Sequence, residues 1–438
     1  MVFLKRVVIE NFKSIAFCDV ELGPLTYLVG PNGAGKTNFL QALRFVSASL
    51  QYSLNEVVKR RGGFSSLLYS SHGLYESFQA PQPNRMLGIR LEFAFPSGQT
   101  GHYALRLKSK VTPTADFQVQ DEELVLSPFP NPPGQTEIFF RAHKGKIIQT
   151  NLEPLFQWSP SQVTSWTPIP PQTSLCLIGL SGFEPFRQVY TALTQINLYD
   201  FDNLFEIRQI QQLTNSYPLS MNGDNLASII NFLAHEYPQI KERIENYLKA
   251  VVPSVHGIKV IPSSTLFPGT SVIHGFQEAL LVFEQIPPNG QAAQKSAFAA
   301  SAMSDGTLRI LGILTALFQT GPHPVNVVCI EEPELYLHPA AAAVLREAME
   351  EASLTKQVIV TCHSPDILDD HTVNPDSILA VISDKGASQI GHLSQAGMTV
   401  LKDHLFTPGE LLRMDQLTPI IAVADTRTNL FDLGVEAQ

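Results

Sequence analysis

The sequence predicts an α/β fold in which a mixed or parallel core sheet is accompanied by an antiparallel sheet and by an inserted helical or irregular subdomain. Three observations predict it. Continuous apolar runs at 325–330 and 357–362 are typical of strands buried on both faces. Apolar and polar residues alternate over 87–95 and 103–111, which indicates half-buried antiparallel strands. A proline-rich stretch and then helical patterns fill the long segment between these two groups.

These patterns divide the chain into three segments. Residues 1–111 form an N-terminal lobe, residues 112–300 an inserted strand, loop and helical region, and residues 301–438 a C-terminal lobe. The hydrophobic fraction of 44% allows a large core, yet no apolar run approaches the roughly 20 residues of a membrane span. No signal-peptide layout and no CxxC pair is present. We therefore expect a reduced, cytoplasmic protein without membrane insertion.

The N-terminal lobe begins with two expected strands, at 2–10 and 17–22, and its central feature is a glycine-rich turn. The turn reads Gly30-Pro31-Asn32-Gly33-Ala34-Gly35-Lys36-Thr37 and lies between the apolar run 25–29 and a helical pattern over 36–48. Strand, Gly-x-x-x-x-Gly-Lys-Thr and helix together are the sequence and context of a phosphate-binding loop.

The chemistry of this loop suits a nucleoside triphosphate with Mg²⁺. Glycines accept positive φ, so successive backbone N–H groups can point at one centre, and the helix N-terminus adds partial positive charge. Lys36 can reach the β- and γ-phosphates, and the Thr37 hydroxyl can bind Mg²⁺. We expect nucleotide contacts from the following residues of the turn and the helix start: Asn32, Gly33, Gly35, Lys36, Thr37 and Asn38.

A second anion-binding helix start is predicted at Ser304-Asp305-Gly306-Thr307, which opens the apolar run 308–317. A serine hydroxyl and a glycine at a helix N-terminus can face a phosphate, so Ser304 and Gly306 are candidate nucleotide contacts. An ordinary helix cap is the alternative explanation of the same residues.

Carboxylates follow the apolar run 325–330, in the sequence Glu331-Glu332-Pro333-Glu334. Side chains at the carboxyl end of a parallel strand lie where ligands bind in open α/β sheets. We expect Glu331 to join the Mg²⁺ shell and Glu332 to orient or deprotonate the attacking water. The alternative is an acidic cap of the helix that begins near Pro339.

The strand expected at 357–362 ends in His363-Ser364-Pro365. Because this histidine follows the carboxylate strand by one helix, we predict that His363 senses the γ-phosphate. A purely structural histidine is the alternative.

In this order and spacing the residues resemble the ABC-type ATPases of the SMC/RecF/OLD branch. The middle of the chain, 112–300, carries almost none of the likeness, and we assign no Q-loop. The motifs that carry it are Ile9 to Ser14 (opening strand), Pro31 to Asn38 (Walker A), Ser304 to Thr307 (signature), Glu331 to Glu334 (Walker B and D-loop, with glutamate in place of the commoner leading aspartate), Thr361 to Pro365 (switch loop) and Pro408 to Leu412 (tail element).

The resemblance implies a stand-alone, OLD-like ATPase without a Toprim domain. Two copies would close head to tail on two ATP molecules, with Lys36 of one copy facing Ser304 of the other across one γ-phosphate. ATP binding would then drive formation of a homodimer and hydrolysis would release it, so that the nucleotide acts as a conformational switch.

Three biological uses of such a switch remain open. The first is action on DNA in repair or phage defence, through the basic stripe Arg106, Lys108 and Lys110. The alternative interpretation of these three residues is a strand face that is simply exposed to solvent. The second is control of a separate nuclease or toxin effector, since the short stretch after His363 leaves no room for a Toprim domain. The third is the energy-coupling subunit of a membrane transporter, which the long segment between Thr37 and Ser304 disfavours.

Overall fold

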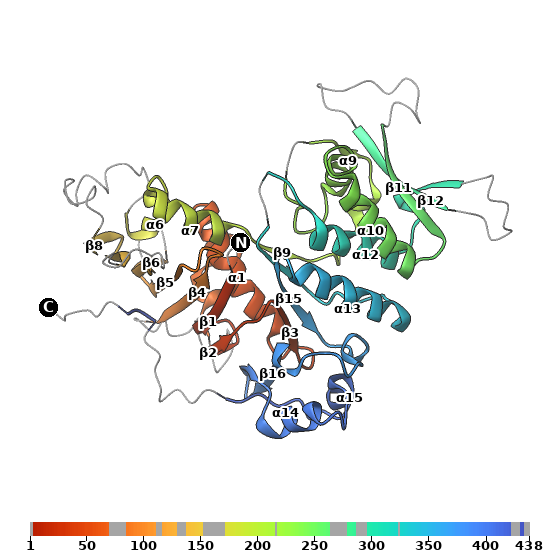
Figure 1. Cartoon of the computed structure of the whole chain (residues 1–438). Coiled ribbons are helices and arrows are strands. Elements are labelled where there is room, and N and C mark those ends of the chain that lie inside the picture. Colours follow the sequence, from red (N-terminus) through yellow and green to blue (C-terminus); the bar gives the residue numbers. More distant parts are fainter. Residues whose placement is uncertain are drawn as a thin grey trace. The chain divides into compact units, whose positions relative to one another are not determined.

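The computed structural model describes residues 3–69, 85–110, 116–128, 137–151, 171–214, 217–262, 278–285, 296–322, 325–421 and 430–432. The chain forms two compact units (Figure 1). The first comprises Met1–Ile196, Asn374–Phe406 and Met414–Gln438, and the second comprises Asn197–Val373 and Thr407–Arg413. The predicted boundaries after residues 111 and 300 stay a prediction. They divide the chain into continuous segments, whereas each of these units combines segments that are far apart in the sequence.

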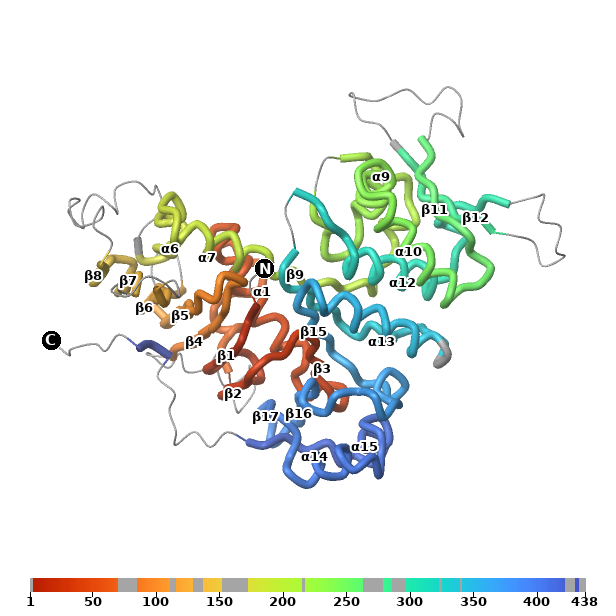
Figure 2. Tube along the Cα trace, viewed as in Figure 1, coloured from red at the N-terminus to blue at the C-terminus, as the bar shows by residue number. Residues whose placement is uncertain are grey.

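The first unit contains a seven-stranded antiparallel sheet with the strand order β2-β1-β4-β5-β6-β7-β8 (Figure 2). The predicted alternation is confirmed, because Leu87, Ile89 and Leu91 on one strand and Tyr103 and Leu105 on the next are all buried. The strands are β1 (Phe3–Phe12), β2 (Ile15–Glu21), β4 (Met86–Ala94), β5 (Thr100–Ser109), β6 (Phe117–Leu126), β7 (Ile138–His143) and β8 (Lys146–Thr150). Val111, expected on the second of these faces, lies outside the described residues.

A second sheet region of the same unit carries the glycine-rich turn. Strand β3 (Leu25–Val29) pairs in parallel with β16 (Ile378–Asp384), and β16 pairs in antiparallel with β17 (Ala387–His392). Helix α1 (Lys36–Gln51) follows the turn and buries its apolar stripe, as the helical period predicted. Helix α7 (Glu184–Thr194) packs on α1, where the Tyr190 hydroxyl donates to the carbonyl of Leu50 at 3.1 Å.

The remaining helices of the first unit, among the residues that the structure describes, are short. They are α2 (Leu54–Arg60), η1 (Phe64–Leu67), η3 (Pro171–Thr173), α6 (Cys176–Leu180), η7 (Pro375–Ser377) and α14 (Gln395–Lys402).

The second unit holds the parallel strands β14 (Val327–Ile330) and β15 (Gln357–Cys362), with β9 (Ile196–Tyr199) next to β14. Its helices are α8 (Phe205–Arg208), α9 (Leu226–Glu236), α10 (Pro238–Val251), η5 (Ala300–Ala302), α12 (Asp305–Phe318), α13 (Pro339–Ser353), η6 (Pro365–Leu368) and α15 (Pro408–Arg413). A separate antiparallel sheet contains β10 (Gln211–Gln212), β11 (Val255–Pro262), β12 (Glu278–Gln285) and β13 (Ser296–Ala299).

Helix α12 is buried along its length, because α9, α10 and α13 all pack on it. At its C-terminal end, the ring of Tyr247 stacks on Phe318 with a centroid distance of 5.3 Å. The Tyr247 hydroxyl also donates to the Glu351 carboxylate of α13 at 2.6 Å. Tyr247 of α10 therefore links the C-terminal ends of α12 and α13.

The predicted α/β fold class is confirmed by these parallel, mixed and antiparallel strand pairings together with their covering helices. Cys18, Cys329 and Cys362 are buried and form no disulfide bond. Of the helices in the described ranges, none has the length and hydropathy needed to cross a bilayer.

Candidate functional site

The glycine-rich turn of the first unit takes a conformation that only glycine tolerates at several positions. Gly33 and Gly35 have φ angles of 78° and 105°. A Cβ atom on Gly30 would lie 1.9 Å from the carbonyl oxygen of Val381 in β16, and one on Gly35 would lie 1.9 Å from Oγ of Ser388 in β17. The turn is therefore shaped both by its own glycines and by two strands from near the end of the chain.

The side chain of Lys36 folds back over the first part of this turn. Its Nζ donates to the carbonyl oxygens of Gly30 at 2.7 Å and Pro31 at 3.0 Å, and the residue is only 4% exposed. The ammonium group is thus held within the turn rather than in solvent. This arrangement fits a loop that surrounds an anion with backbone N–H groups and one buried cation.

A chain of polar contacts braces the loop from outside. Asn38 Nδ2 donates to Oγ of Ser14 at 2.6 Å, and Ser14 Oγ lies 2.6 Å from Oγ of Ser388. The backbone N–H of Ser388 also donates to the carbonyl of Ser14 at 2.7 Å. The turn between β1 and β2, which supplies Ser14, therefore positions the start of α1. Sequence reasoning noted the opening-strand motif but found no role for Ser388.

In the second unit, Glu332 lies directly after β14 in a strained backbone conformation. Its φ is 43°, which is unusual for a residue other than glycine. Its N–H donates to Oγ1 of Thr361 on the neighbouring strand β15 at 3.0 Å, which holds the backbone in place. Strain of this kind persists where the surroundings fix a side chain for function.

The structure brings Glu332 and His363 together at the ends of the neighbouring strands β14 and β15, while their predicted roles stay predictions. Nδ1 of His363 lies 3.6 Å from Oε2 of Glu332 and 3.4 Å from Oε1 of Glu334. Oε1 of Glu334 accepts from the backbone N–H groups of His363 at 2.8 Å and Ser364 at 3.1 Å. Glu334, to which the sequence analysis gave no role, is therefore a positioning residue for the switch loop.

The start of α12 confirms Ser304 as its cap. Ser304 Oγ accepts from the N–H of Thr307 at 3.2 Å. A Cβ atom on Gly306 would lie 2.8 Å from the carbonyl oxygen of Tyr336, whose own φ is 64°. The signature segment and the segment after Glu334 thus meet closely enough that only glycine fits at position 306.

Arg309 joins the signature helix to the carboxylate strand and was not found from the sequence. Its side chain is 1% exposed, Nη1 contacts Oδ1 of Asp202 at 2.7 Å, and Nη2 donates to the carbonyls of Glu331 at 3.1 Å and Glu332 at 3.0 Å. The planar guanidinium suits such a fork of acceptors. In the sequence, the one sign of this role is that an arginine interrupts the apolar run 308–317.

The tail element, α15, is fixed to the segment that follows His363. Oγ1 of Thr407 donates to Oδ1 of Asp369 at 2.7 Å, and Nη2 of Arg413 donates to Oδ2 at 2.9 Å. These hydrogen bonds, that of Arg413 first, lower the pKa of Asp369. A Cβ atom on Gly409 would lie 2.6 Å from the carbonyl oxygen of Pro365. The tail motif is therefore a support for the switch loop.

The chain fits Mg²⁺ bound chiefly through nucleotide phosphates rather than in a protein cage. In the described parts of the chain, no three or more His, Cys, Asp and Glu side chains gather in a way that could hold a metal ion. Mg²⁺ in such sites takes one or two protein ligands and keeps waters, and that Thr37 and Glu331 supply them stays a prediction. Burial raises the pKa of the Cys329 thiol, and the negative charge of nearby Glu331 raises it further. Cys329 therefore stays protonated.

The predicted basic stripe is only partly available on the surface of the first unit. Arg106 lies 3.3 Å from the Glu10 carboxylate, and its guanidinium stacks on the Phe431 ring at 4.9 Å. Lys108 is half-buried, and exposed Lys110 donates to the Gln172 amide oxygen at 2.9 Å. The three residues do lie together on and just after β5, but Arg106 is already engaged.

Two family models match the chain. Residues 3–150 match the AAA ATPase domain, and residues 274–369 match the AAA domain described as putative AbiEii toxin, Type IV TA system. The first match covers the phosphate loop and the antiparallel sheet, and the second covers the signature helix, Glu331, Glu332 and His363. The two matches, with the relatives below, support an ATPase similar to the ABC-type ATPases of the SMC, RecF and OLD group.

The curated relatives of this ATPase agree with that assignment. The OLD nuclease of Thermus scotoductus is 25% identical over 383 residues, which are 83% of this chain and 59% of the relative. RecF of Porphyromonas gingivalis, a DNA replication and repair protein, is 34% identical over 138 residues, 28% of this chain and 34% of the relative. Structural maintenance of chromosomes protein 1 of Schizosaccharomyces pombe is 25% identical over 37% of this chain and 13% of the relative.

The ATPase thus spans less than two thirds of the length of each of these relatives. Among solved structures, an SMC head bound to the C-winged helix domain of ScpA aligns with a TM-score of 0.49 and 15% identity, over 91% of this chain and 99% of that one.

Proposed function

We propose that two copies of this ATPase enclose Mg-ATP and hydrolyse it, and that closing and opening of the dimer is the functional output. The observation that carries the proposal is the Glu332–His363 pair at the end of β14, where the backbone of Glu332 is strained and fixed by Thr361. A carboxylate and a histidine within 3.6 Å of each other at a strand end can handle the proton of an attacking water.

Each residue has a distinct role in this proposal. Lys36 and the loop N–H groups bind the β- and γ-phosphates, and Mg²⁺, held by Thr37 and Glu331, would neutralise phosphate charge. Glu332 takes the proton of the attacking water, and His363 contacts the γ-phosphate. Ser304 and Gly306 of the second copy would complete the site, because a capped helix start presents partial positive charge.

The decisive experiment mixes two inactive variants. Lys36→Ala disables the phosphate loop and Ser304→Arg disables the signature segment, so each variant alone should show no ATPase activity. If one site combines Lys36 of one copy with Ser304 of the other, a heterodimer keeps one intact site. An equimolar mixture should then regain roughly a quarter of the wild-type rate, since random pairing yields half heterodimers with one active site of two.

The control for this experiment is a mixture of two variants of the same half. Lys36→Ala mixed with Thr37→Ala leaves no intact site under either arrangement and should stay inactive. If the mixture of Lys36→Ala and Ser304→Arg also stays inactive, although size-exclusion chromatography shows that the two variants assemble, the shared site is wrong.

We further propose that this switch serves DNA repair or phage defence and controls a separate effector such as a nuclease or toxin. The support is the likeness to an OLD nuclease and to RecF, whose names refer to a nuclease and to DNA replication and repair. None of the relatives reported above has the name of a transporter subunit, so the transporter alternative gains nothing from them.

DNA binding would involve Lys108 and Lys110, because Arg106 already contacts Glu10 and the Phe431 ring. We expect the double variant Lys108→Glu/Lys110→Glu to weaken binding of a duplex DNA and to lower the salt slope of the binding constant by about 1–2, since each phosphate contact contributes about 0.9. The measurement is fluorescence anisotropy at several salt concentrations. The charge-matched control Lys146→Glu/Lys249→Glu, at two exposed positions, should leave the slope unchanged. Equal slopes for all three proteins would remove this surface.

A further inference from the structure

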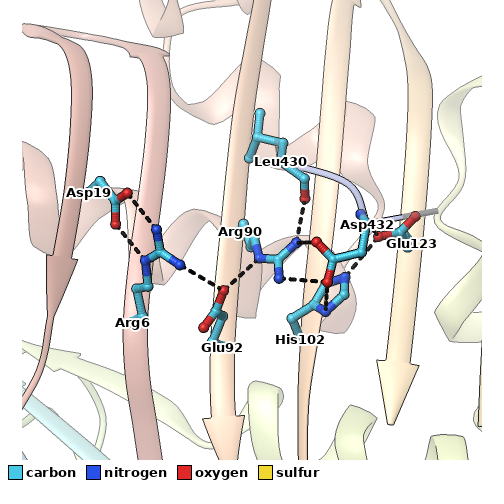
Figure 3. A network of polar contacts seen from close by, with 8 residues as sticks. All are labelled: Arg6, Asp19, Arg90, Glu92, His102, Glu123, Leu430 and Asp432. Carbon is cyan, nitrogen blue, oxygen red and sulfur yellow. Dashed lines mark hydrogen bonds and ion pairs between the residues drawn. The ribbon is translucent and has the colours of Figure 1, made fainter. Parts of the chain in front are cut away.

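One face of the antiparallel sheet carries a short segment from late in the chain, Leu430-Phe431-Asp432. Figure 3 shows its Leu430 and Asp432 beside Arg90 and His102. Leu430 is 1% exposed and Phe431 is 8% exposed, and Leu430 packs with Val8 of β1 and Ala104 of β5. The ATPase site does not involve these residues.

Each residue of the segment has a fitted partner on the sheet. A Cβ atom on Gly88 would lie 2.4 Å from Cδ1 of Leu430, so this glycine forms a notch for the leucine side chain. The ring of Phe431 contacts two guanidinium groups, those of Arg106 at 4.9 Å and Arg141 at 5.4 Å from its centroid. Such cation–π contacts recognise an aromatic side chain specifically.

Asp432 completes the recognition through charge. Nη1 and Nη2 of Arg90 contact its two carboxylate oxygens at 2.7 and 3.0 Å, and Nη1 also donates to the carbonyl of Leu430 at 3.2 Å. The N–H of Asp432 donates to buried Glu123 at 2.8 Å, and Nδ1 of His102 lies 3.5 Å from the Asp432 carboxylate. The sheet therefore contacts both the side chain and the backbone of this segment, as a protein does with a bound peptide.

The charges of the sheet face explain why an acidic residue fits. Arg6 pairs with Asp19, Arg106 with Glu10, and Arg141 with Glu123. Arg90 is 6% exposed, and on the sheet it forms an ion pair with Glu92. Arg90 shares this carboxylate with Arg6, which also contacts Glu92. Asp432 therefore supplies a carboxylate to an arginine that the sheet pairs incompletely. Burial opposes ionisation of Asp432, yet the hydrogen bond from Arg90, with the charges of His102 and Arg90, leaves the pKa of Asp432 lowered.

We propose that this face is a peptide-recognition site for an apolar–aromatic–acidic sequence, and that the chain's own residues 430–432 occupy it as an exchangeable intramolecular ligand. The specificity elements are the Gly88 notch, the contact of Arg106 and Arg141 with the aromatic ring, and the Arg90 fork for the carboxylate. A cavity of about 280 Å³ beside Asp432, lined in part by Lys5, Phe93 and Glu137, leaves room for residues that follow the aspartate of a bound peptide. Tethering makes the chain's own segment a strong competitor, because it raises the effective concentration to the millimolar range.

The test is a peptide-binding measurement on the full chain. The probe is a fluorescein-labelled peptide with the sequence of residues 428–434, Thr-Asn-Leu-Phe-Asp-Leu-Gly. Phe431→Ala/Asp432→Ala vacates the site, so we expect this variant to bind the probe at least tenfold more tightly than the wild-type chain does. A probe with alanine in place of its phenylalanine should bind at least tenfold more weakly to the vacated chain.

Two further variants separate recognition from folding. Adding Gly88→Ala to the vacated chain narrows the notch and should weaken probe binding, whereas adding Ile148→Ala, which truncates a 57% exposed side chain on the same sheet, should change nothing. ATP binding reports that each variant is folded. Equal probe affinity for the vacated and wild-type chains, or for the two probes, would overturn the proposal. A wild-type dimer that Phe431→Ala dissociates without nucleotide would also overturn it, because the segment would then occupy a second copy.

Discussion

Replacing Lys36 with alanine should abolish nucleotide binding by this ATPase. Nζ of Lys36 is a buried cation that the loop carbonyls of Gly30 and Pro31 hold in place. Hydrogen bonds to charged groups contribute about 1.5–3 kcal/mol each, so losing two to the phosphates should weaken binding by about 100-fold or more. Isothermal titration calorimetry with a non-hydrolysable ATP analogue measures this directly.

The control for Lys36→Ala is Lys59→Ala, which removes the same charge from an exposed position on α2. It should bind the analogue as the wild type does. Thermal melting of both variants separates lost binding from lost fold, because the alanine at position 36 also frees two carbonyl groups. Unchanged affinity of a folded Lys36→Ala protein would overturn the assignment of the phosphate loop.

The second large effect is expected for Glu332→Gln. The amide keeps the shape of the side chain but cannot accept the proton of the attacking water, and positioned general bases typically contribute about 10²–10⁴-fold to the rate. We expect ATP binding to persist, kcat to fall by at least about 100-fold, and an ATP-bound dimer to accumulate because the release step is blocked. Phosphate release assays and size-exclusion chromatography with Mg-ATP measure the two consequences.

Glu350→Gln is the matched control, since it makes the same exchange on helix α13 outside the strand end. It should leave both turnover and oligomeric state unchanged. A Glu332→Gln protein that hydrolyses ATP normally would show that another group takes the proton. A protein that binds Mg-ATP without turnover and still elutes only as a monomer would contradict the two-copy arrangement while leaving the base assignment intact.

Local sequence patterns predicted the elements of the fold and the strand ends that carry the candidate site. The glycine spacing from Gly30 to Gly35 predicted a phosphate loop because the motif needs strand and helix on either side, and both are present. Glu332 and His363 were each predicted to follow a buried strand, and the structure shows that these strands are parallel neighbours. Patterns of this kind depend on residues close in sequence or on a general rule of sheet topology.

The supports of the site were not predictable in the same way. Ser388 contacts Ser14 although a large part of the chain separates them, and no periodicity reports such a pairing. Arg309 looked like an interruption of an apolar helix, whereas it binds the carbonyls of the carboxylate strand. The engagement of Arg106 by Phe431 was likewise hidden, because the sequence shows charge but not the partner that covers it.

The close approach of β16 and β17 to the glycine-rich turn has a consequence for biosynthesis. The strands that supply Val381 and Ser388 are translated long after the turn. A nascent chain therefore carries the motif before it has the strands that shape it. Competence to bind nucleotide should arise only after β16 and β17 have emerged and paired.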